Sequence, residues 1–97
     1  MNKIVTLVLL NGAEVVGSLV EEGDDTTTIY KPRLVAPQQN GIAFVPGISM
    51  TGVEIKGDYV MPNRSILFMI DTQDQVASAW QQATSGIQLA TGNGLVT

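Results

Sequence analysis

Short apolar runs, each about the length of one β-strand, recur along the first two thirds of the chain and are separated by turn residues. Residues 3–10 are rich in β-branched and apolar side chains and end at Asn11-Gly12. That dipeptide suits a type I′ turn, because both of its residues accept a positive φ angle. Residues 13–21 alternate as a returning strand, and Gly17 inside it predicts a bulge or sharp bend. The pattern therefore predicts an N-terminal β-hairpin.

Three more strands are expected after the polar turn that ends this hairpin, at residues 26–31, 42–45 and 65–70. The first of them stops at Pro32, and residues 33–36 can continue it beyond the kink. The segment from 47 to 64 is irregular, with one short extended piece at 53–56. The last strand is apolar on both faces, which is typical of a buried strand. Together with the hairpin, these runs make five strands.

The pattern changes from strand to helix after residue 71. Thr72 and Gln75 have the spacing of a capping box, with Thr72 as the N-cap. Helical spacing gathers the apolar residues of this segment on one face, namely Val76, Ala79, Trp80, Ala83 and Ile87. Ser85-Gly86 is expected to end the helix. We predict one helix over residues 73–85, with Trp80 packed in the core or an interface, and a Gly-rich tail at 87–97.

Composition narrows the functions that this chain can have. Its 97 residues predict one domain. The hydrophobic fraction is 44% and the charged fraction only 14%, and a surface so short of charge is typical of a homo-oligomer. The net charge is −4 with five basic residues, which argues against broad electrostatic binding of nucleic acid. Local binding at a few positions stays open.

The chain contains neither cysteine nor histidine. Disulfides, thiolate metal sites and Ser-His or Cys-His catalysis are therefore excluded. Asp24-Asp25 alone supplies too few oxygens for a hard cation. We expect no enzyme activity, no cofactor and no metal.

The apolar run at 4–10 is short for a signal peptide, and no stretch approaches the ~18 apolar residues of a membrane span. A cytoplasmic protein without membrane association is expected.

The segment from Leu10 to Leu19 resembles the first Sm motif of Sm, Lsm and Hfq proteins, which has a Leu, a polar-Gly turn, a strand with an internal Gly and a second Leu. More of the chain is similar to small Sm-like proteins of tailed cyanobacterial phages, at Lys31-Pro32, Leu34-Val35, Pro37, residues 42–46 and 66–70, and Ser85-Gly86-Ile87. The resemblance implies an all-β fold: a five-stranded, strongly bent small barrel over residues 3–71 with one C-terminal helix, in a single domain of residues 1–97.

The resemblance also implies a homo-oligomeric ring, in which the edge of the fourth strand pairs with the edge of the neighbouring copy's fifth strand, and single-stranded RNA bound at the pore. The structural positions are Asn11, Gly12 and Gly17, which set the turn and the bend. The interface positions are Ile42, Phe44, Ile66 and Phe68. The RNA-binding positions are Thr28, Tyr30, Lys31, Arg33, Lys56 and Arg64. Tyr30 also fits a barrel-wall role, with its hydroxyl at the rim.

The chain departs from the family pattern where RNA would bind. Thr28 occupies the position of the family's asparagine and lacks the paired amide donor and acceptor. Ile55-Lys56-Gly57 mimics the Ile-Arg-Gly of the second motif, with Lys in place of Arg. A competing register, which we prefer, places strands four and five at 42–46 and 66–70 and leaves this tripeptide in a connecting segment. Two functions stay open: an RNA-binding ring, or a structural or protein-interaction ring of phage origin that has lost RNA affinity.

Overall fold

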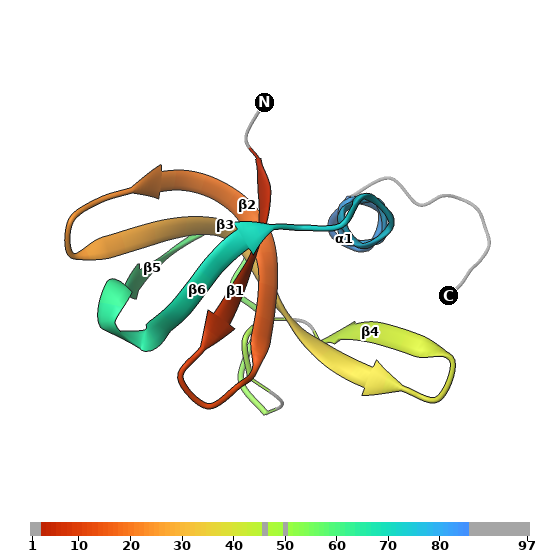
Figure 1. Cartoon of the computed structure of the whole chain (residues 1–97). Coiled ribbons are helices and arrows are strands. Elements are labelled where there is room, and N and C mark those ends of the chain that lie inside the picture. The colour runs from red at the N-terminus through yellow and green to blue at the C-terminus, as the bar shows by residue number, and fades with distance from the viewer. Residues whose placement is uncertain (1–2, 46, 50, 86–97) are drawn as a thin grey trace.

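The computed structural model describes residues 3–45, 47–49 and 51–85 (Figure 1). The elements within these residues are β1 Ile4–Leu9, β2 Glu14–Glu22, β3 Thr26–Gln38, β4 Gly41–Val45, β5 Asp58–Pro62, the 3-10 turn η1 Asn63–Ser65, β6 Ile66–Asp71 and α1 Asp74–Thr84. The strands form one antiparallel sheet in the order β4-β3-β2-β1-β6, and β5 also pairs with β3. The predicted all-β class with one C-terminal helix is confirmed. The described sheet has six strands instead of five and is open, with β4 and β5 at one edge and β6 at the other.

The N-terminal hairpin forms as predicted, but its turn is not type I′. The Leu9 N–H donates to the Ala13 carbonyl at 2.8 Å, which leaves a three-residue loop. Gly12 has a φ of 87°, whereas Asn11 is not among the described residues with positive φ. The Asn11 side chain instead accepts a hydrogen bond from the Ala13 N–H at 3.0 Å. A three-residue loop closed by a left-handed glycine needs only one positive φ angle, so Gly12 alone meets the requirement.

The centre of the fold is a bend in β3. The strand was predicted to stop at Pro32, but it continues beyond this residue, as the segment 33–36 allowed. Lys31 takes a φ of 49°, and the pairing of β3 with β2 shifts register between Val16 and Ser18, at Gly17. A Cβ atom on Gly17 would collide with the Ile29 side chain and lie 3.3 Å from the Pro32 Cα. Gly17 thus lets the two strands approach closely at the bend, in agreement with the bulge that its position predicts.

The bend lets β3 pair with two strands at one edge. Residues Thr26–Tyr30 pair with β5, and residues Leu34–Gln38 pair with β4. The second half of β3 and β4 together form an arm that projects from the body of the sheet (Figure 1). The extended piece predicted at 53–56 is wrong, because the strand in this region is β5 at 58–62. Ile55-Lys56-Gly57 lies in the connection before β5, as in the register that we preferred.

The main core lies on one face of the sheet. Its fully buried members come from four strands and are Val5, Leu7, Val15, Ile29 and Met61. Thr6 and Val16 alternate with these residues and therefore point to the opposite face. Both are also buried, at 8% and 1% exposure. The sheet thus has a second apolar face, beside which α1 lies (Figure 1).

Helix α1 starts without the predicted capping box. Its N-cap is Gln73, which makes no side-chain capping bond. The Thr72 hydroxyl instead hydrogen-bonds the Thr6 hydroxyl at 2.8 Å. The apolar face is also shifted: Trp80 is buried and Val76 half-buried, whereas the alanines predicted beside them, Ala79 and Ala83, are exposed. The predicted stop at Gly86, Ile87 and the tail lie outside the described residues.

No helix in the described part is long and apolar enough to cross a membrane.

Gly17→Ala should destabilise the protein by about 1–3 kcal/mol, because the added methyl group overpacks the bend against Ile29. Gly57→Ala is the matched control, since nothing lies within 4 Å of a Cβ atom there and Gly57 is not a positive-φ glycine. Urea unfolding of both variants measures the difference. Equal stability of Gly17→Ala and the unmodified protein would show that the two strands do not approach closely at the bend.

Candidate functional site

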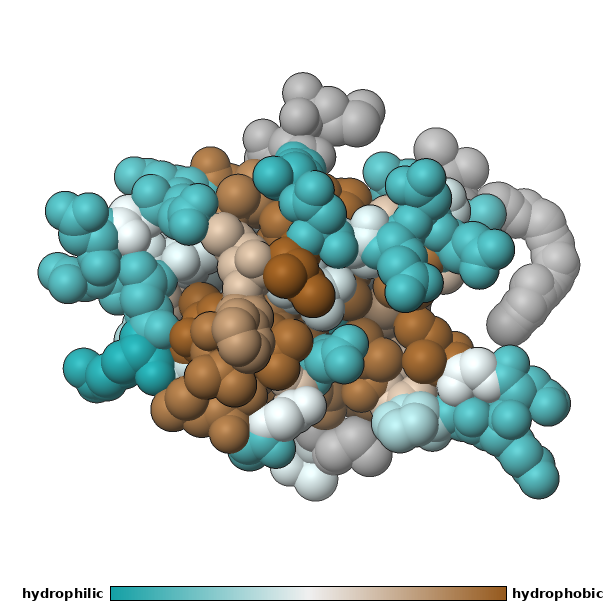
Figure 2. Space-filling view, in the orientation of Figure 1, coloured by the Kyte–Doolittle hydropathy of each residue, from teal (hydrophilic) through white to brown (hydrophobic). Residues whose placement is uncertain are grey.

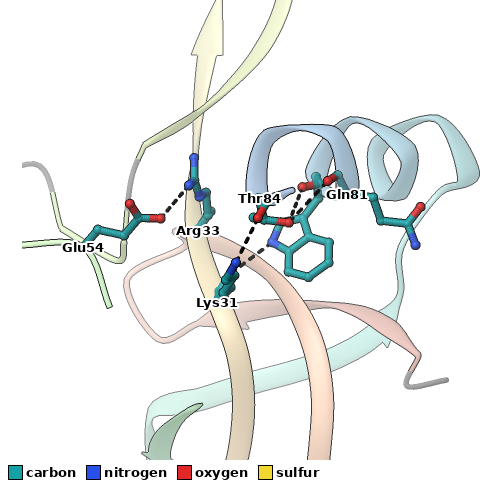
Figure 3. Close-up of polar contacts among 6 residues, drawn as sticks. Lys31, Arg33, Glu54, Gln81 and Thr84 are labelled. Atoms are coloured by element: carbon teal, nitrogen blue, oxygen red, sulfur yellow. Dashed lines mark hydrogen bonds and ion pairs between the residues drawn. The ribbon is translucent and has the colours of Figure 1, made fainter. Parts of the chain in front are cut away.

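Lys31, predicted as an RNA contact, joins the bend of β3 to the end of α1 (Figure 3). Its ammonium group donates to the Thr84 carbonyl at 2.9 Å, and its own carbonyl accepts the Trp80 indole N–H at 3.0 Å. Its backbone N–H donates to the Gly57 carbonyl at 3.1 Å. A positive charge is favourable at a helix C-terminus, where carbonyl groups lack intrahelical partners. Lys31 therefore docks the helix through both its side chain and its backbone.

Arg33, the next basic residue on β3, is also engaged within the chain. Its guanidinium lies 2.5 Å from a carboxylate oxygen of Glu54, in the connection between β4 and β5 (Figure 3). The two side chains are only 14% and 26% exposed. The Arg33 Nε atom is buried with no hydrogen-bond partner among the described residues. This charge fixes the β4–β5 connection against β3 and is largely shielded from a ligand in solution.

Tyr30 and Thr28 remain at the surface of β3, on the half that pairs with β5. Tyr30 is 39% exposed, and the Lys31 ammonium group lies 5.4 Å from the centroid of its ring. Such a distance permits a cation–π contact. Thr28 is half-buried. An accessible aromatic ring next to a positive charge is suited to stacking on a base or another planar group.

Lys56 and Arg64 are the exposed basic residues of this region. Lys56 lies two residues before β5, at the end where Tyr30 pairs with Asp58. Arg64 follows β5, in η1 at the opposite end of the strand. A single copy therefore does not bring these two charges together. Repetition around a ring would instead produce two separate rings of positive charge.

Asn63, which the sequence pattern did not single out, ties η1 to the acidic loop between β2 and β3. Its side-chain N–H groups donate to the Gly23 carbonyl at 2.8 Å and the Asp24 carbonyl at 3.2 Å, and its Oδ1 accepts from the Thr27 hydroxyl at 2.6 Å. Its backbone N–H donates to the Asp25 carbonyl at 2.8 Å. Arg64 is thus held next to a loop that is rich in exposed carboxylates, at Glu21, Glu22, Asp24 and Asp25.

The predicted interface residues lie on the two outermost strands of the sheet. Ile42 and Phe44 belong to β4, and Ile66 and Phe68 to β6. Ile42 is 45% exposed and Phe68 60% exposed, whereas Phe44 and Ile66 are half-buried. The neighbouring residues Leu67 and Ile70 of β6 are also exposed, although the sequence pattern predicted a buried strand. Figure 2 shows the resulting apolar areas on one side of the molecule.

Four of these apolar residues, Ile42, Phe44, Phe68 and Ile70, share one face of the sheet, whereas Ile66 packs against the main core. Phe68 pairs with Val8 and Ile70 with Thr6, so both project from the face opposite the main core. Ile42 lies on that face too, because it lines a groove together with Thr6 and Ile70. Phe44 is two residues along β4 from Ile42 and has the same orientation. Both edges of the open sheet therefore present apolar side chains on the same side.

No family model matches this chain, and no curated protein matches it either. No three potential metal-ligating side chains gather among the described residues. The candidate site therefore consists of two apolar sheet edges, an exposed tyrosine and two exposed basic residues.

Glu54→Gln should cost about 1–3 kcal/mol of stability, because it leaves the buried Arg33 guanidinium without its anionic partner. Lys3→Ala serves as the comparison, since Lys3 and Asp71 form an ion pair of 3.2 Å in which both side chains are mostly exposed. That pair should contribute less than about 1 kcal/mol. Chemical denaturation of the two variants tests the difference. Equal losses of unfolding free energy in the two variants would mean that burial does not strengthen the contribution of the Arg33–Glu54 pair.

Two substitutions of Lys31 separate its helix contact from its backbone strain. Lys31→Ala and Lys31→Gly both remove the contact with Thr84, but only glycine takes the left-handed φ angle without steric cost. The Gly variant should be more stable than the Ala variant by up to about 1 kcal/mol, after the greater entropy of unfolded glycine is included. Urea midpoints provide the comparison. A more stable Ala variant would contradict the left-handed conformation of Lys31.

Proposed function

We propose that this chain is an Sm-like protein that assembles into a homo-oligomeric ring and binds single-stranded RNA at positions repeated around the pore. The observation that carries the proposal is the pair of apolar edges at β4 and β6. Phe68 and Ile70 project from one edge, and Ile42 and Phe44 from the other, all on the same face. In this proposal each chain is a strongly bent, Sm-like barrel, and pairing of β4 with β6 between copies closes the ring.

Edge pairing would account for the apolar surface of β4 and β6, each of which pairs with only one strand among the described residues. An exposed, apolar edge strand is a template for pairing with another chain. Joining β4 of one copy to β6 of the next would satisfy the outer backbone groups of both strands. It would also place Ile42 and Phe44 beside Phe68 and Ile70 of the neighbouring copy, and such cross-strand pairs stabilise a sheet. A closed ring leaves neither β4 nor β6 with a free edge, which favours it over an open filament.

RNA binding in this ring would depend on Tyr30, Thr28, Lys56 and Arg64. Tyr30 offers an exposed ring for base stacking. Lys56 and Arg64 are exposed and have no ion-pair partner among the described residues. Because each is repeated once per copy, a single RNA strand would meet several positive charges in succession. Lys31 and Arg33 would support the site indirectly, by holding α1 and the β4–β5 connection.

A second candidate is a structural or protein-interaction ring of phage origin without RNA affinity. It is favoured by the use of Lys31 and Arg33 within the chain and by the carboxylates beside Arg64. Those carboxylates would repel phosphate groups at that end of the sheet. The ring itself is common to both candidates, so RNA binding is the property that separates them.

Assembly is tested by light scattering coupled to size-exclusion chromatography. The unmodified protein should have a mass several times the 10.3 kDa of one chain. Phe68→Asp, which places a charge on the exposed β6 edge, should yield monomers with an unchanged circular dichroism spectrum. Val53→Asp is the matched control, because Val53 is 92% exposed and lies outside the strands, and it should leave the ring intact. A monomeric unmodified protein would refute the ring.

RNA binding is tested by fluorescence anisotropy with U-rich and A-rich oligonucleotides. Affinity should fall as salt rises, and Lys56→Ala and Arg64→Ala should each weaken binding and reduce the salt dependence. Lys3→Ala is the control of equal charge, because Lys3 lies outside the proposed site. If neither oligonucleotide binds at low salt while the mass of the ring is retained, the result supports the second candidate, a structural or protein-interaction ring.

A further inference from the structure

Helix α1 is anchored by one buried side chain and by the contacts at its C-terminal end. Trp80 is the only buried residue of Asp74–Thr84, and most of the others are exposed. The Trp80 indole N–H donates to the Lys31 carbonyl at 3.0 Å, and the Lys31 ammonium group donates to the Thr84 carbonyl at 2.9 Å (Figure 3). An isolated helix of 11 residues is marginal in water. An element anchored in this way is typical of those that open at lower free energy than the whole fold.

The anchored end of α1 lies close to the exposed ring of Tyr30. Tyr30 follows the core residue Ile29 in β3, so its ring projects from the face opposite the main core, beside which α1 also lies. The Lys31 ammonium group connects the ring and the helix, since it lies 5.4 Å from the centroid of the ring and 2.9 Å from the Thr84 carbonyl oxygen. A positive charge and an aromatic ring are therefore adjacent, and the end of the helix contacts the charge.

The helix end that reaches Lys31 is its negative end. The last carbonyl groups of a helix lack intrahelical partners and together carry about half an elementary negative charge. Docked α1 therefore neutralises part of the Lys31 charge, and its carbonyl groups would repel a phosphate group that approached the ammonium group. Docking of α1 thus opposes phosphate binding at the position where a phosphate would accompany a base stacked on Tyr30.

We propose that α1 masks a phosphate-binding site formed by Lys31 and Tyr30, so that docking of the helix and binding of single-stranded RNA at this site compete. The inference rests on the proposed function for the identity of the ligand. When α1 is released, the Lys31 ammonium group loses the Thr84 carbonyl and donates a charge-assisted hydrogen bond to a phosphate oxygen, while the base stacks on Tyr30. Coupling between two binding events is reciprocal, so RNA promotes release of the helix by the same factor by which release strengthens RNA binding.

Trp80 is the only tryptophan of the chain and reports docking of the helix directly. U-rich and A-rich oligonucleotides are added to the unmodified protein, and the emission of Trp80 is followed together with the anisotropy of the oligonucleotide. The emission should shift to longer wavelength as the indole becomes exposed to water, with the same half-saturation as binding. Binding without a shift of the emission would overturn the proposal. This measurement needs no variant.

Ala79→Pro releases the helix while keeping Trp80, Lys31 and Tyr30, because Ala79 is exposed and proline breaks the interior of a helix. RNA affinity should rise about fivefold or more, the lower end of typical coupling between two sites. Ala79→Gln is the matched control, since glutamine at the same exposed position is compatible with a helix, and its affinity should be unchanged. Adding Lys31→Met to Ala79→Pro should abolish the gain, whereas adding Lys3→Met should not. Circular dichroism reports whether the sheet is retained.

The outcomes separate this inference from the proposed function. If the unmodified protein binds RNA and Ala79→Pro binds no more tightly than Ala79→Gln, α1 does not mask the site and only the inference is overturned. If Ala79→Pro alone binds, the masked site is supported and RNA binding by the docked protein is refuted. If neither binds at low salt, both are refuted. A gain that persists with Lys31→Met would show that another cation binds the phosphate and would overturn the assignment of the site.

Discussion

The bend of β3 at Lys31-Pro32 is the constraint on which the other features depend. It requires a glycine opposite, because any side chain at Gly17 would collide with Ile29. Once bent, one strand pairs with β5 along its first half and with β4 along its second, which produces the projecting arm. The same bend exposes the Lys31 carbonyl to Trp80, so the position of α1 follows from it as well.

The chain has only five basic residues, so the contacts that each of them makes show which are available to bind a polyanion. Two of the five basic residues, Lys31 and Arg33, stabilise the bend region by binding a helix carbonyl and a half-buried carboxylate. A third, Lys3, pairs with Asp71 at the surface. Lys56 and Arg64 are what remains for a polyanionic ligand, and Arg64 lies beside four exposed carboxylates. Nucleic-acid affinity of a single copy is therefore expected to be weak, and any useful affinity must come from repetition in an assembly.

Features set by neighbouring residues could be predicted from the sequence, and features set by distant contacts could not. The hairpin, the bulge at Gly17 and the helix followed from local turn chemistry and periodicity. The predicted capping box does not form, and the Thr72 hydroxyl instead hydrogen-bonds the hydroxyl of Thr6, 66 residues away in the sequence. Strand β5 was missed because its pairing with β3 depends on the bend. The contacts of Asn63 and Arg33 likewise join segments far apart in the sequence, and no local pattern marks them. The basic site residues were identified by type, but their intrachain partners were not.

The central claim is that β4 and β6 are joined between copies, and amide hydrogen exchange at single-residue resolution tests it most directly. In each strand, alternate N–H groups point away from the partner strand within the chain. Our account predicts that these outward N–H groups in residues 41–45 and 66–71 are as protected from exchange as those of the central strand β2, and that Phe68→Asp abolishes the protection at both edges together. Outward N–H groups that exchange as fast as those of the exposed loop at residues 23–25 would contradict it.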